Sequence, residues 1–442
     1  MTRIKTETVY ECQQCQYQSP RWIGRCPECG RWNSFVETTL PVSPKSAGQF
    51  KSVTQSQVYT LKSIPQKDLE RLLIGIGEFD HVLGGGIVPG SVTLIAGEPG
   101  IGKSTLLLEV AAKICQNPKL SVLYVSGEES ARQIKIRAER MQINGERILI
   151  LAENNVEQII SEIEKLKPSL VIIDSIQTLY TQELNGVSGS VGQVRESAAK
   201  ILRVVKSSHT PLFLIGHVTK EGVVAGPKVL EHIVDVVLYL EGDLFHTYRI
   251  LRSTKNRFGS TSEVGIFEME QKGLKEVVNP SQFFLNDQRE KTPGSVVVAT
   301  LEGERPILVE IQALVTKSSL AIPRRTAVGI DFNRLVLLCA VISSRTGVNL
   351  NTYDIYVNVA GGLKVREPAI DLGISLAIAS SFKNQAADYK MAVFGEVGLL
   401  GEVRKVSREE QRIKEAQKLG FHKFISAETA RNLNQALKEA FG

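Results

Sequence analysis

The chain has 442 residues, enough for two or three domains, and a net charge of +6. Hydrophobic residues make up 43% and charged residues 23%, which is typical of a globular protein and excludes a disordered or fibrous chain. No apolar run approaches the roughly 18 residues of a membrane helix, and the first residues lack the apolar segment of a secretion signal. We therefore expect a cytoplasmic protein with no membrane partner. The mild basicity permits a nucleic-acid partner, although an ordinary basic enzyme fits the charge equally well.

Four of the six cysteines lie within the first 29 residues, as two Cys-x-x-Cys pairs separated by ten residues: Cys12, Cys15, Cys26 and Cys29. Two such pairs can supply four thiolates to one tetrahedral Zn²⁺. Disulfides are the alternative, but they suit a secreted chain. We expect the two tryptophans, Trp22 and Trp32, to cover the metal site rather than stack on bases.

Residues 37–62 are rich in Ser, Thr, Gln, Pro and Lys, which predicts a flexible linker. Beyond it, apolar strands alternate with helical patterns as far as about residue 285, as in an α/β protein with a parallel sheet. The predicted strands are Val92–Ala96, Val122–Ser126, Ile148–Leu151, Leu170–Ile173, Leu212–Ile215 and Val236–Glu241.

The most specific motif follows the first of these strands and matches G-x-x-x-x-G-K-[ST]. Its residues are Gly97, Glu98, Pro99, Gly100, Ile101, Gly102, Lys103, Ser104 and Thr105. The glycines let backbone N–H groups point at phosphate oxygens, and the helix expected from about Lys103 adds its positive end. In such loops the lysine reaches the β- and γ-phosphates and the Ser104 hydroxyl ligates Mg²⁺. The motif predicts an ATP site.

Polar residues at the ends of three other predicted strands extend this site, because ligands of such sheets bind at the carboxyl ends of strands. Asp174 ends one strand and is placed to hold the Mg²⁺ together with Ser104. Glu128 follows another and is suited to activate the attacking water. His217 is suited to sense the γ-phosphate, or it is simply a surface histidine near a loop.

The stretch Lys255-Asn-Arg-Phe-Gly259 places two cations on one turn. Lys255 and Arg257 are suited to stabilise a transferring phosphoryl group, as an arginine finger does. A clamp on nucleic-acid phosphates and a solvated turn remain equally open.

Gly84–Gly90, Gly97–Thr105 and Leu170–Asp174 together resemble the motors of RecA-type recombinases and hexameric helicases. With the four-cysteine module and the Lys255–Gly259 turn, the whole chain resembles the bacterial RadA (Sms) family. The resemblance implies a homo-hexameric ring that binds single-stranded and branched DNA. It further implies that ATP drives branch migration during recombinational repair, with the recombinase RecA as a partner.

The same resemblance assigns roles to individual residues. Glu128 becomes the water-activating acid, and Lys255 and Arg257 act at the subunit interface or on DNA. Residues 184–196 and 219–231 fall where RecA-like rings place DNA loops, with Arg195, Lys220 and Lys228 as backbone contacts. Ordinary surface loops are the alternative.

From about residue 291 the segments become β-rich: Ser295–Leu301, Ile307–Leu314, Arg334–Ile342, Ile355–Val359 and Met391–Val397. Val357–Gly362 and Phe394–Gly398 resemble the protease domain of Lon, whose family uses a serine and a lysine. Here Asp371 stands in the place of the serine and Glu410 near that of the lysine, so we expect the fold without the peptidase chemistry. Ser375 and Lys414 are nearby residues of the right types. Six cations are suited to bind DNA or to form a solvated face: Arg324, Arg325, Lys364, Arg366, Arg404 and Lys405.

We therefore predict an α/β chain with a zinc finger over residues 1–36, a linker over 37–62, a RecA-like P-loop ATPase over 63–285 and a Lon-protease-like α+β domain over 286–442. The favoured function is a DNA-dependent ATPase of recombination and repair. An ATP-dependent Lon-type protease is the main alternative, and a non-motor ring ATPase, like those of circadian clocks, is the third.

Overall fold

The computed structural model describes residues 6–12, 17–19, 21–27, 30–41, 70–217, 228–242, 248–285 and 292–442. The chain divides into two compact units. The first holds residues 1–241, 253–261 and 270–274, and the second holds residues 242–252, 262–269 and 275–442. This division differs from the predicted boundary at 285/286, because parts of the segment from 242 to 285 belong to the second unit. Among the described residues, no helix is both long and apolar enough to cross a bilayer.

The N-terminal segment forms a small antiparallel sheet in the order β2-β1-β3, made of β1 (Thr6–Cys12), β2 (Gln18–Ser19) and β3 (Phe35–Pro41). Cys12 pairs with Phe35 in the β1–β3 register. Residues 37–41 therefore form a strand, where the composition predicted the start of a linker. A small apolar cluster of Cys12, Cys26 and Phe35, with Tyr10 and Ile23 packed against it, is the core of this module.

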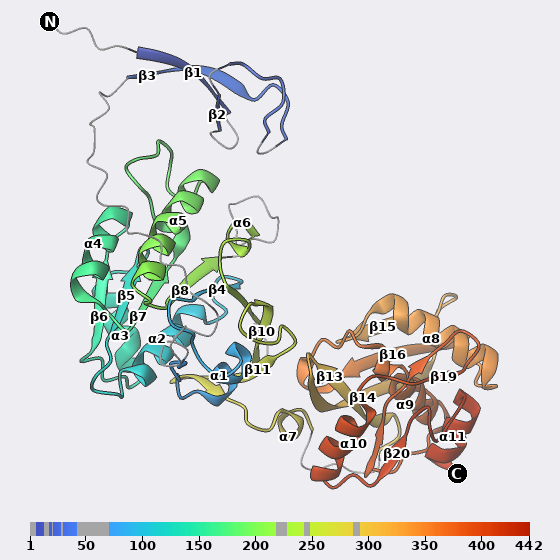
Figure 1. Cartoon of the computed structure of the whole chain (residues 1–442). Coiled ribbons are helices and arrows are strands. Elements are labelled where there is room, and N and C mark those ends of the chain that lie inside the picture. Colours follow the sequence, from blue (N-terminus) through green and yellow to red (C-terminus); the bar gives the residue numbers. More distant parts are fainter. Residues whose placement is uncertain are drawn as a thin grey trace, which may run out of the picture. The chain divides into compact units, whose positions relative to one another are not determined.

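The first unit is built on parallel strands in the order β9-β4-β8-β7-β5-β6 (Figure 1). These are β4 (Val92–Gly97), β5 (Val122–Ser126), β6 (Ile148–Ala152), β7 (Leu170–Asp174), β8 (Leu212–His217) and β9 (Val236–Glu241). All six predicted strands are present. Strands β4, β5 and β7 are buried along their whole length, which explains why they appear in the sequence as continuous apolar runs.

Helices connect these strands: α1 (Gly77–Leu83), α2 (Lys103–Ile114), α3 (Ala131–Arg140), α4 (Val156–Leu166), the 3₁₀ turn η3 (Ile176–Thr178), α5 (Val191–Ser207) and α6 (Lys228–Glu231). One core cluster unites apolar side chains of α4 and α5 with every second residue of β4, β5 and β7. On α4 these are Val156, Ile159 and Ile163, the spacing of one helical face.

Three further strands complete a nine-stranded sheet in the order β12-β11-β10-β9-β4-β8-β7-β5-β6. Among them β10 (Tyr248–Asn256) and β11 (Val264–Glu270) form an antiparallel hairpin, whose register runs from Tyr248–Glu268 to Arg252–Val264. Residues 248–252 and 262–269 of this hairpin belong to the second unit. After β12 (Gly273–Glu276) and α7 (Pro280–Phe284), a six-stranded sheet follows in the order β15-β16-β14-β13-β17-β20. Its strands are β13 (Ser295–Glu302), β14 (Arg305–Lys317), β15 (Arg325–Val328), β16 (Tyr353–Val359), β17 (Met391–Val393) and β20 (Lys423–Ile425).

The helices of this unit are α8 (Phe332–Arg345), α9 (Asp371–Lys383), α10 (Glu409–Lys418) and α11 (Leu433–Phe441), with the short 3₁₀ turns η4 (Ala360–Gly362) and η5 (Pro368–Ile370). A two-stranded sheet of β18 (Glu396–Val397) and β19 (Val403–Arg404) completes it. The arrangement is α+β, as predicted.

One predicted β segment in this unit is wrong. Residues 334–342 lie within helix α8, which begins after the N-cap Asp331, whose carboxylate accepts a hydrogen bond from Arg334 N at 2.8 Å. The run Leu-Val-Leu-Leu-Cys-Ala-Val-Ile is apolar at every position, so its periodicity cannot distinguish a buried strand from a buried helix. Leu335, Leu338 and Ile342 show the helical spacing in the core.

Candidate active site

The predicted phosphate loop joins β4 to α2, and its glycines have the backbone conformations that such a loop needs. Gly100 and Gly102 have φ of 77° and 115°, in the region that favours glycine. At Gly97 a Cβ would lie 2.5 Å from the carbonyl oxygen of Leu240, so no larger residue fits. Helix α2 begins at Lys103, as predicted, and its N-terminal end therefore faces the loop.

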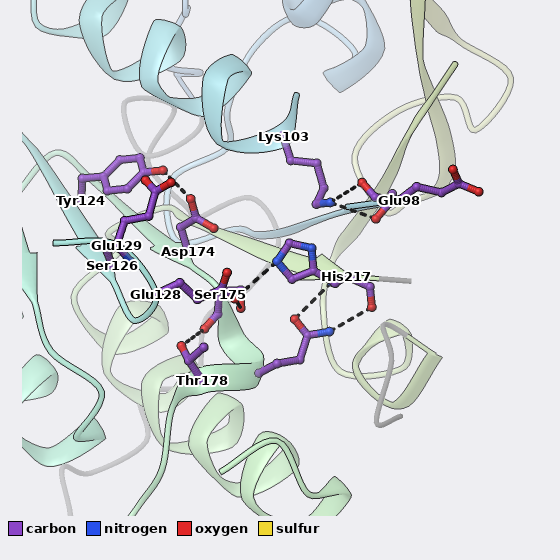
Figure 2. Close-up of polar contacts among 12 residues, drawn as sticks. Glu98, Lys103, Tyr124, Ser126, Glu128, Glu129, Asp174, Ser175, Thr178 and His217 are labelled. Carbon is purple, nitrogen blue, oxygen red and sulfur yellow. Dashed lines mark hydrogen bonds and ion pairs between the residues drawn. The ribbon is translucent and has the colours of Figure 1, made fainter. Parts of the chain in front are cut away.

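Lys103 is buried at the base of this loop. Its Nζ donates hydrogen bonds to the carbonyl oxygens of Gly97 and Glu98, both at 2.9 Å (Figure 2). Burial lowers the pKa of Lys103 to about 8, while the carboxylates of Asp174 and Glu128 act in the opposite direction. A cation that is held only by backbone carbonyls in a buried site suits an anionic ligand such as a polyphosphate.

Two carboxylates meet at the same edge of the sheet, because β5 and β7 are neighbours with Ser126 opposite Asp174. Asp174 ends β7, and its Oδ2 accepts a hydrogen bond from the buried hydroxyl of Tyr124 at 2.6 Å. Glu128 follows β5, and its Oε1 accepts a hydrogen bond from Ser175 Oγ at 2.6 Å (Figure 2). Its side chain is 47% exposed, so it has room for a further ligand.

The neighbouring Glu129 faces a different environment. Its carboxylate pairs with Arg137 on α3, and its backbone N donates to Ser126 Oγ at 3.0 Å. Glu129 is thus held by the protein itself, whereas Glu128 contacts the groups around Lys103 and Asp174. Glu128, rather than Glu129, is therefore available to a ligand of this site.

His217 ends β8 beside these carboxylates. Its Nε2 lies 3.5 Å from Glu128 Oε1, and burial together with the charge of Lys103 lowers its pKa. Gln177 on η3 holds the backbone of His217 from both sides, because its Nε2 donates to the carbonyl oxygen at 3.0 Å and its Oε1 accepts from the amide at 3.1 Å. His217 therefore belongs to the site and is not an ordinary surface histidine.

Sequence reasoning missed Tyr124, Ser175 and Gln177. Ser175 and Gln177 lie directly after the strand that ends at Asp174, in the run Asp-Ser-Ile-Gln-Thr. That position at the carboxyl end of a parallel strand is a signal for polar residues of a site.

The turn from Lys255 to Gly259 lies at the amino ends of the parallel strands, opposite the carboxyl ends that carry the phosphate loop. Arg257 N donates to the carbonyl oxygen of Asp235 at 3.2 Å, and Asp235 N donates to that of Val92, the first residue of β4, at 3.0 Å. The phosphate loop begins at the opposite end of β4, about 17 Å away at 3.3 Å per residue. Within one chain, Lys255 and Arg257 are therefore remote from the loop.

The two cations of this turn differ in their contacts. Lys255 Nζ donates to the carbonyl oxygens of Glu231 at 2.6 Å and Val234 at 2.8 Å. Arg257 lies 3.2 Å from the buried carboxylate of Asp235, and its side chain is 54% exposed. Arg257 is the more available of the two to an external group.

Two of the remaining predicted DNA contacts lie on helices and not in loops. Arg195 is exposed, but it lies on helix α5 and not in a loop, because α5 begins at Val191. Lys228 is the first residue of α6. Lys220 lies outside the described residues.

Of the four predicted zinc ligands, the structure describes Cys12 and Cys26, and both are buried in the cluster around Phe35. Cys15 and Cys29 lie outside the described residues. Buried thiols from two Cys-x-x-Cys pairs in a module with so small a core fit a structural Zn²⁺. Trp22 and Trp32, which we expected to cover the metal site, are 53% and 71% exposed and do not belong to this apolar cluster.

At the Lon-like position of the second unit, Asp371 begins α9 and is fully buried. Its Oδ1 accepts from Arg334 Nε at 2.9 Å, its other oxygen pairs with the same guanidinium, and Val397 N donates to it at 3.2 Å. Glu410 is exposed on α10. Ser375 Oγ is buried and donates to the carbonyl oxygen of Asp371 at 2.8 Å, while Lys414 is exposed on α10.

The predicted cations of this unit fall into two sets. Three are engaged within the chain: Arg325 donates to the carbonyl oxygens of Arg324, Leu350 and Tyr353, Arg404 pairs with Glu402, and Lys405 pairs with Glu428. Arg324, Lys364 and Arg366 make up the second set and are exposed, as are Arg404 and Lys405 of the first set. Since Leu363 and Val365 are buried, Lys364 and Arg366 lie on the same outward side of an extended segment.

Three family models match the chain. They are described as an AAA domain over residues 67–223, a rubredoxin metal-binding domain over residues 10–37 and subunit ChlI of Mg-chelatase over residues 329–430. They support a RecA-like P-loop ATPase core with an N-terminal zinc ribbon and a C-terminal α+β domain.

Among solved structures, a KaiC-like protein of the archaeon Pyrococcus horikoshii is 20% identical with a TM-score of 0.39, over 47% of this chain and 99% of that one.

Full-length relatives are much closer. The DNA repair protein RadA of Bacillus subtilis is 50% identical over 424 residues, which cover 95% of this chain and 92% of the relative. That of Halalkalibacterium halodurans is 51% identical over 425 residues, with the same coverage of 95% and 92%. The DNA repair protein RadA of Streptococcus pyogenes serotype M1 is 50% identical over 426 residues, covering 96% and 94%. The chain belongs to the RadA family of DNA repair proteins.

Proposed function

We propose that this chain is a DNA-dependent ATPase of homologous recombination and repair that works as a homo-hexameric ring. It binds single-stranded and branched DNA, promotes branch migration and has RecA as a partner. The observation that carries the proposal is that the charged groups lie in two sets, one at the carboxyl edge of the parallel strands and one at their amino edge. Lys103, Glu128 and Asp174 converge at one edge, while Lys255 and Arg257 lie at the other.

At the first edge the chain's own residues bind and hydrolyse ATP. The loop from Gly97 to Thr105 cradles the phosphates, and Lys103 leaves its two carbonyl partners to contact the β- and γ-phosphates. Ser104 and Asp174 would hold the Mg²⁺, which neutralises charge on the phosphates. The hydroxyl of Tyr124 fixes the orientation of Asp174.

Glu128 takes the proton of the attacking water. Ser175 holds one carboxylate oxygen, and the half-exposed remainder can accept a hydrogen bond from water. His217 lies between Glu128 and Lys103, so it is placed to respond to the γ-phosphate. Its backbone is held by Gln177, and the chain continues from it toward residues 219–231, a proposed DNA loop.

The second edge acts on another subunit or on DNA. Because Lys255 and Arg257 are remote from the loop of their own chain, a role in hydrolysis requires a neighbouring copy. A ring in which one subunit's turn meets the next subunit's loop satisfies this requirement. Arg195, Lys220 and Lys228 are the proposed backbone contacts to single-stranded DNA.

The C-terminal unit serves in this proposal as a scaffold and DNA platform without peptidase activity. Asp371 is a poor nucleophile and is already paired with Arg334. The hydroxyl of Ser375 is buried against a backbone carbonyl, and Lys414 is solvent-exposed, so these two residues do not supply the missing dyad. These contacts argue against the alternative of a Lon-type protease.

The test uses two inactive variants that fail for different reasons. Lys103→Ala lacks the loop cation, and Arg257→Ala lacks the exposed cation of the turn. In a mixture of the two, some interfaces combine an intact loop from one chain with an intact turn from the other. We expect the mixed protein to recover a measurable part of the ATPase activity that single-stranded DNA stimulates.

Lys206→Ala is the matched control, because Lys206 contacts the same Asp235 carboxylate at 3.4 Å and should be dispensable. If Arg257→Ala alone hydrolyses ATP normally, the turn acts on DNA and not on ATP. If single-stranded DNA stimulates none of the proteins, including the parent, the DNA-dependent part of the proposal is wrong.

A further inference from the structure

The zinc ribbon presents two tryptophans to solvent, and they are the only tryptophans of the chain. Trp22 is 53% and Trp32 71% exposed, and neither belongs to the apolar cluster around Cys12, Cys26 and Phe35. The residue next to Trp22, Ile23, packs against that cluster instead. Keeping two such large rings in water costs free energy, which makes them candidates for a contact with a ligand.

Backbone pairing holds the two rings in place. Arg25 and Trp32 form an antiparallel bridge, Cys26 N donates to the carbonyl oxygen of Arg31 at 2.8 Å, and Asn33 N donates to that of Gly24 at 2.8 Å. Atoms of both rings lie 3.8 Å from the point where a Cβ of residue 24 would be, so the rings are close together. The pair is therefore a preorganised surface and not two independent side chains.

Three arginines lie beside these tryptophans in the sequence, and one of them contacts a ring. Arg21, Arg25 and Arg31 are all exposed, and the Arg25 guanidinium lies 5.9 Å from the centroid of Trp32. Residues 21–27 and 30–34 contain no acidic side chain, and Glu28 between them lies outside the described residues. We refer to Arg21, Trp22, Arg25, Arg31 and Trp32 as the Arg–Trp face.

We propose that the Arg–Trp face binds single-stranded nucleic acid, with bases stacked on Trp22 and Trp32 and phosphates contacted by the arginines. Indole rings stack on any base, and this is how sequence-tolerant single-strand sites obtain affinity. A duplex does not offer the flat faces of its bases, so the site selects unpaired strands. A protein partner is less well matched, because three arginines without a neighbouring described acid favour a polyanion. The proposal deepens the proposed function by naming a DNA site outside the ATPase unit.

Tryptophan fluorescence tests this directly, because all of the chain's indole emission arises from the Arg–Trp face. The full-length, zinc-loaded protein is titrated without nucleotide with oligothymidylate and with an abasic strand of equal length. The abasic strand keeps the phosphates and lacks the bases. We expect oligothymidylate to quench the emission and to bind about tenfold or more tightly than the abasic strand, the effect of losing one stacked base.

Variants then separate stacking from folding. Trp32→Ala should weaken binding of a labelled oligothymidylate about tenfold, and Trp32→Phe should restore most of it because a ring is retained. Zinc content measured on each variant shows whether the ribbon is still folded. Tyr389→Ala is the matched control, since Tyr389 is an exposed ring with Lys390 5.6 Å from its centroid in the other unit.

Each outcome is decisive. Equal quenching by the abasic strand would show that the Arg–Trp face binds only phosphates, and it would overturn the proposal that bases stack on the tryptophans. Labelled DNA that binds without any change in emission would place the single-strand site elsewhere and leave the proposed function intact. Loss of association with another protein in Trp32→Ala, at unchanged DNA affinity, would also overturn the proposal. If this proposal holds and the proposed function is wrong, single-stranded DNA will quench the emission without stimulating ATP hydrolysis.

Discussion

Two clusters in this chain both combine a carboxylate with a basic residue, but they differ in what their charged groups contact. At the carboxyl edge of the ATPase sheet, Lys103 contacts only carbonyl oxygens, and Glu128 is half-exposed with one hydroxyl partner. In the C-terminal unit, Asp371 is fully buried and its oxygens are taken up by Arg334 and Val397 N. The first cluster has capacity left for a ligand, whereas the carboxylate of the second is enclosed by its partners within the chain. Unused hydrogen-bonding capacity is therefore a better guide to chemistry here than the presence of charge.

The same contrast applies to Arg412 and Glu367 in the C-terminal unit. The Arg412 side chain is fully buried, pairs with Glu367 and donates to the carbonyl oxygen of Ala299 at 2.6 Å. Such pairs specify packing and are costly to break, because each leaves an uncompensated charge behind. These buried charged residues of the C-terminal unit therefore have a structural role.

The largest effect should come from Lys103→Ala. It removes the cation that we propose contacts the phosphates in the transition state, so we expect phosphate release to fall by at least about a hundredfold. Lys113→Ala, on the last turn of the same helix, is the control and should retain activity. Hydrolysis within a few-fold of the parent in Lys103→Ala would show that the loop does not bind the phosphates as described.

Glu128→Gln should hydrolyse ATP about a hundredfold more slowly and bind it with nearly unchanged affinity, because the role we propose for Glu128, that of the base, belongs to the chemical step. Single-turnover hydrolysis and equilibrium binding of a fluorescent ATP analogue measure the two separately. Glu129→Gln is the matched control, since Glu129 pairs with Arg137. If the two variants exchange these behaviours, Glu129 is the base.

In the second cluster a comparable substitution should change stability and leave ATP chemistry intact. Asp371→Asn leaves the Arg334 guanidinium without its counter-charge, and we expect the C-terminal unit to lose about 2–4 kcal/mol of unfolding free energy. Urea denaturation followed by circular dichroism measures the loss, with the exposed Glu428→Gln as control. Asp371→Ser should gain no casein-degrading activity. Peptidase activity in the parent protein would contradict the contrast drawn between the two clusters.

Features that depend on local chemistry could be predicted from the sequence. The parallel strands are continuous apolar runs, and the phosphate loop has a fixed spacing of glycines before a helix, so both were located correctly. Helix α8 differs from the predicted strand because an all-apolar run has no period, and the helix begins after the N-cap Asp331. Arg195 lies on α5 and not in the predicted loop, because that helix already begins at Val191, after the N-cap Ser190.

The missed parts of the site depend on neighbours that are distant in the chain. Ser175 meets Glu128 across 47 residues, and Gln177 meets His217 across 40 residues, because β7 lies between β5 and β8. Arg334 and Asp371 are likewise 37 residues apart. No periodicity encodes such pairs, so only the strand order reveals which polar groups are satisfied internally.

The smallest expected effect concerns Glu109, a partly buried carboxyl that belongs to neither cluster. It lies on α2, and its Oε1 accepts a hydrogen bond from Leu274 N at 2.7 Å. Burial raises its pKa from the usual 4.5 to about 7, although that hydrogen bond and the charge of Lys113 act against the rise. Gly273 beside it has φ of 137°, and a Cβ there would lie 1.8 Å from Glu109 Oε1, so the carboxyl is closely confined.

Because the pKa of Glu109 is higher in the folded chain than in the unfolded one, folding favours its protonated form. The contribution of Glu109 to the free energy of unfolding should therefore be highest below about pH 4.5, fall as the pH rises toward 7 and change no further above it. Glu109→Gln keeps the acceptor for Leu274 N and removes the charge. We expect it to match the parent at acidic pH and to exceed it by about 1–2 kcal/mol at pH 8, a figure reduced for partial solvent screening. Denaturation across this pH range measures the difference, with the exposed Glu139→Gln as control. A difference that does not vary with pH would mean that Glu109 stays ionised and that its bond to Leu274 N, rather than its confinement, determines its charge.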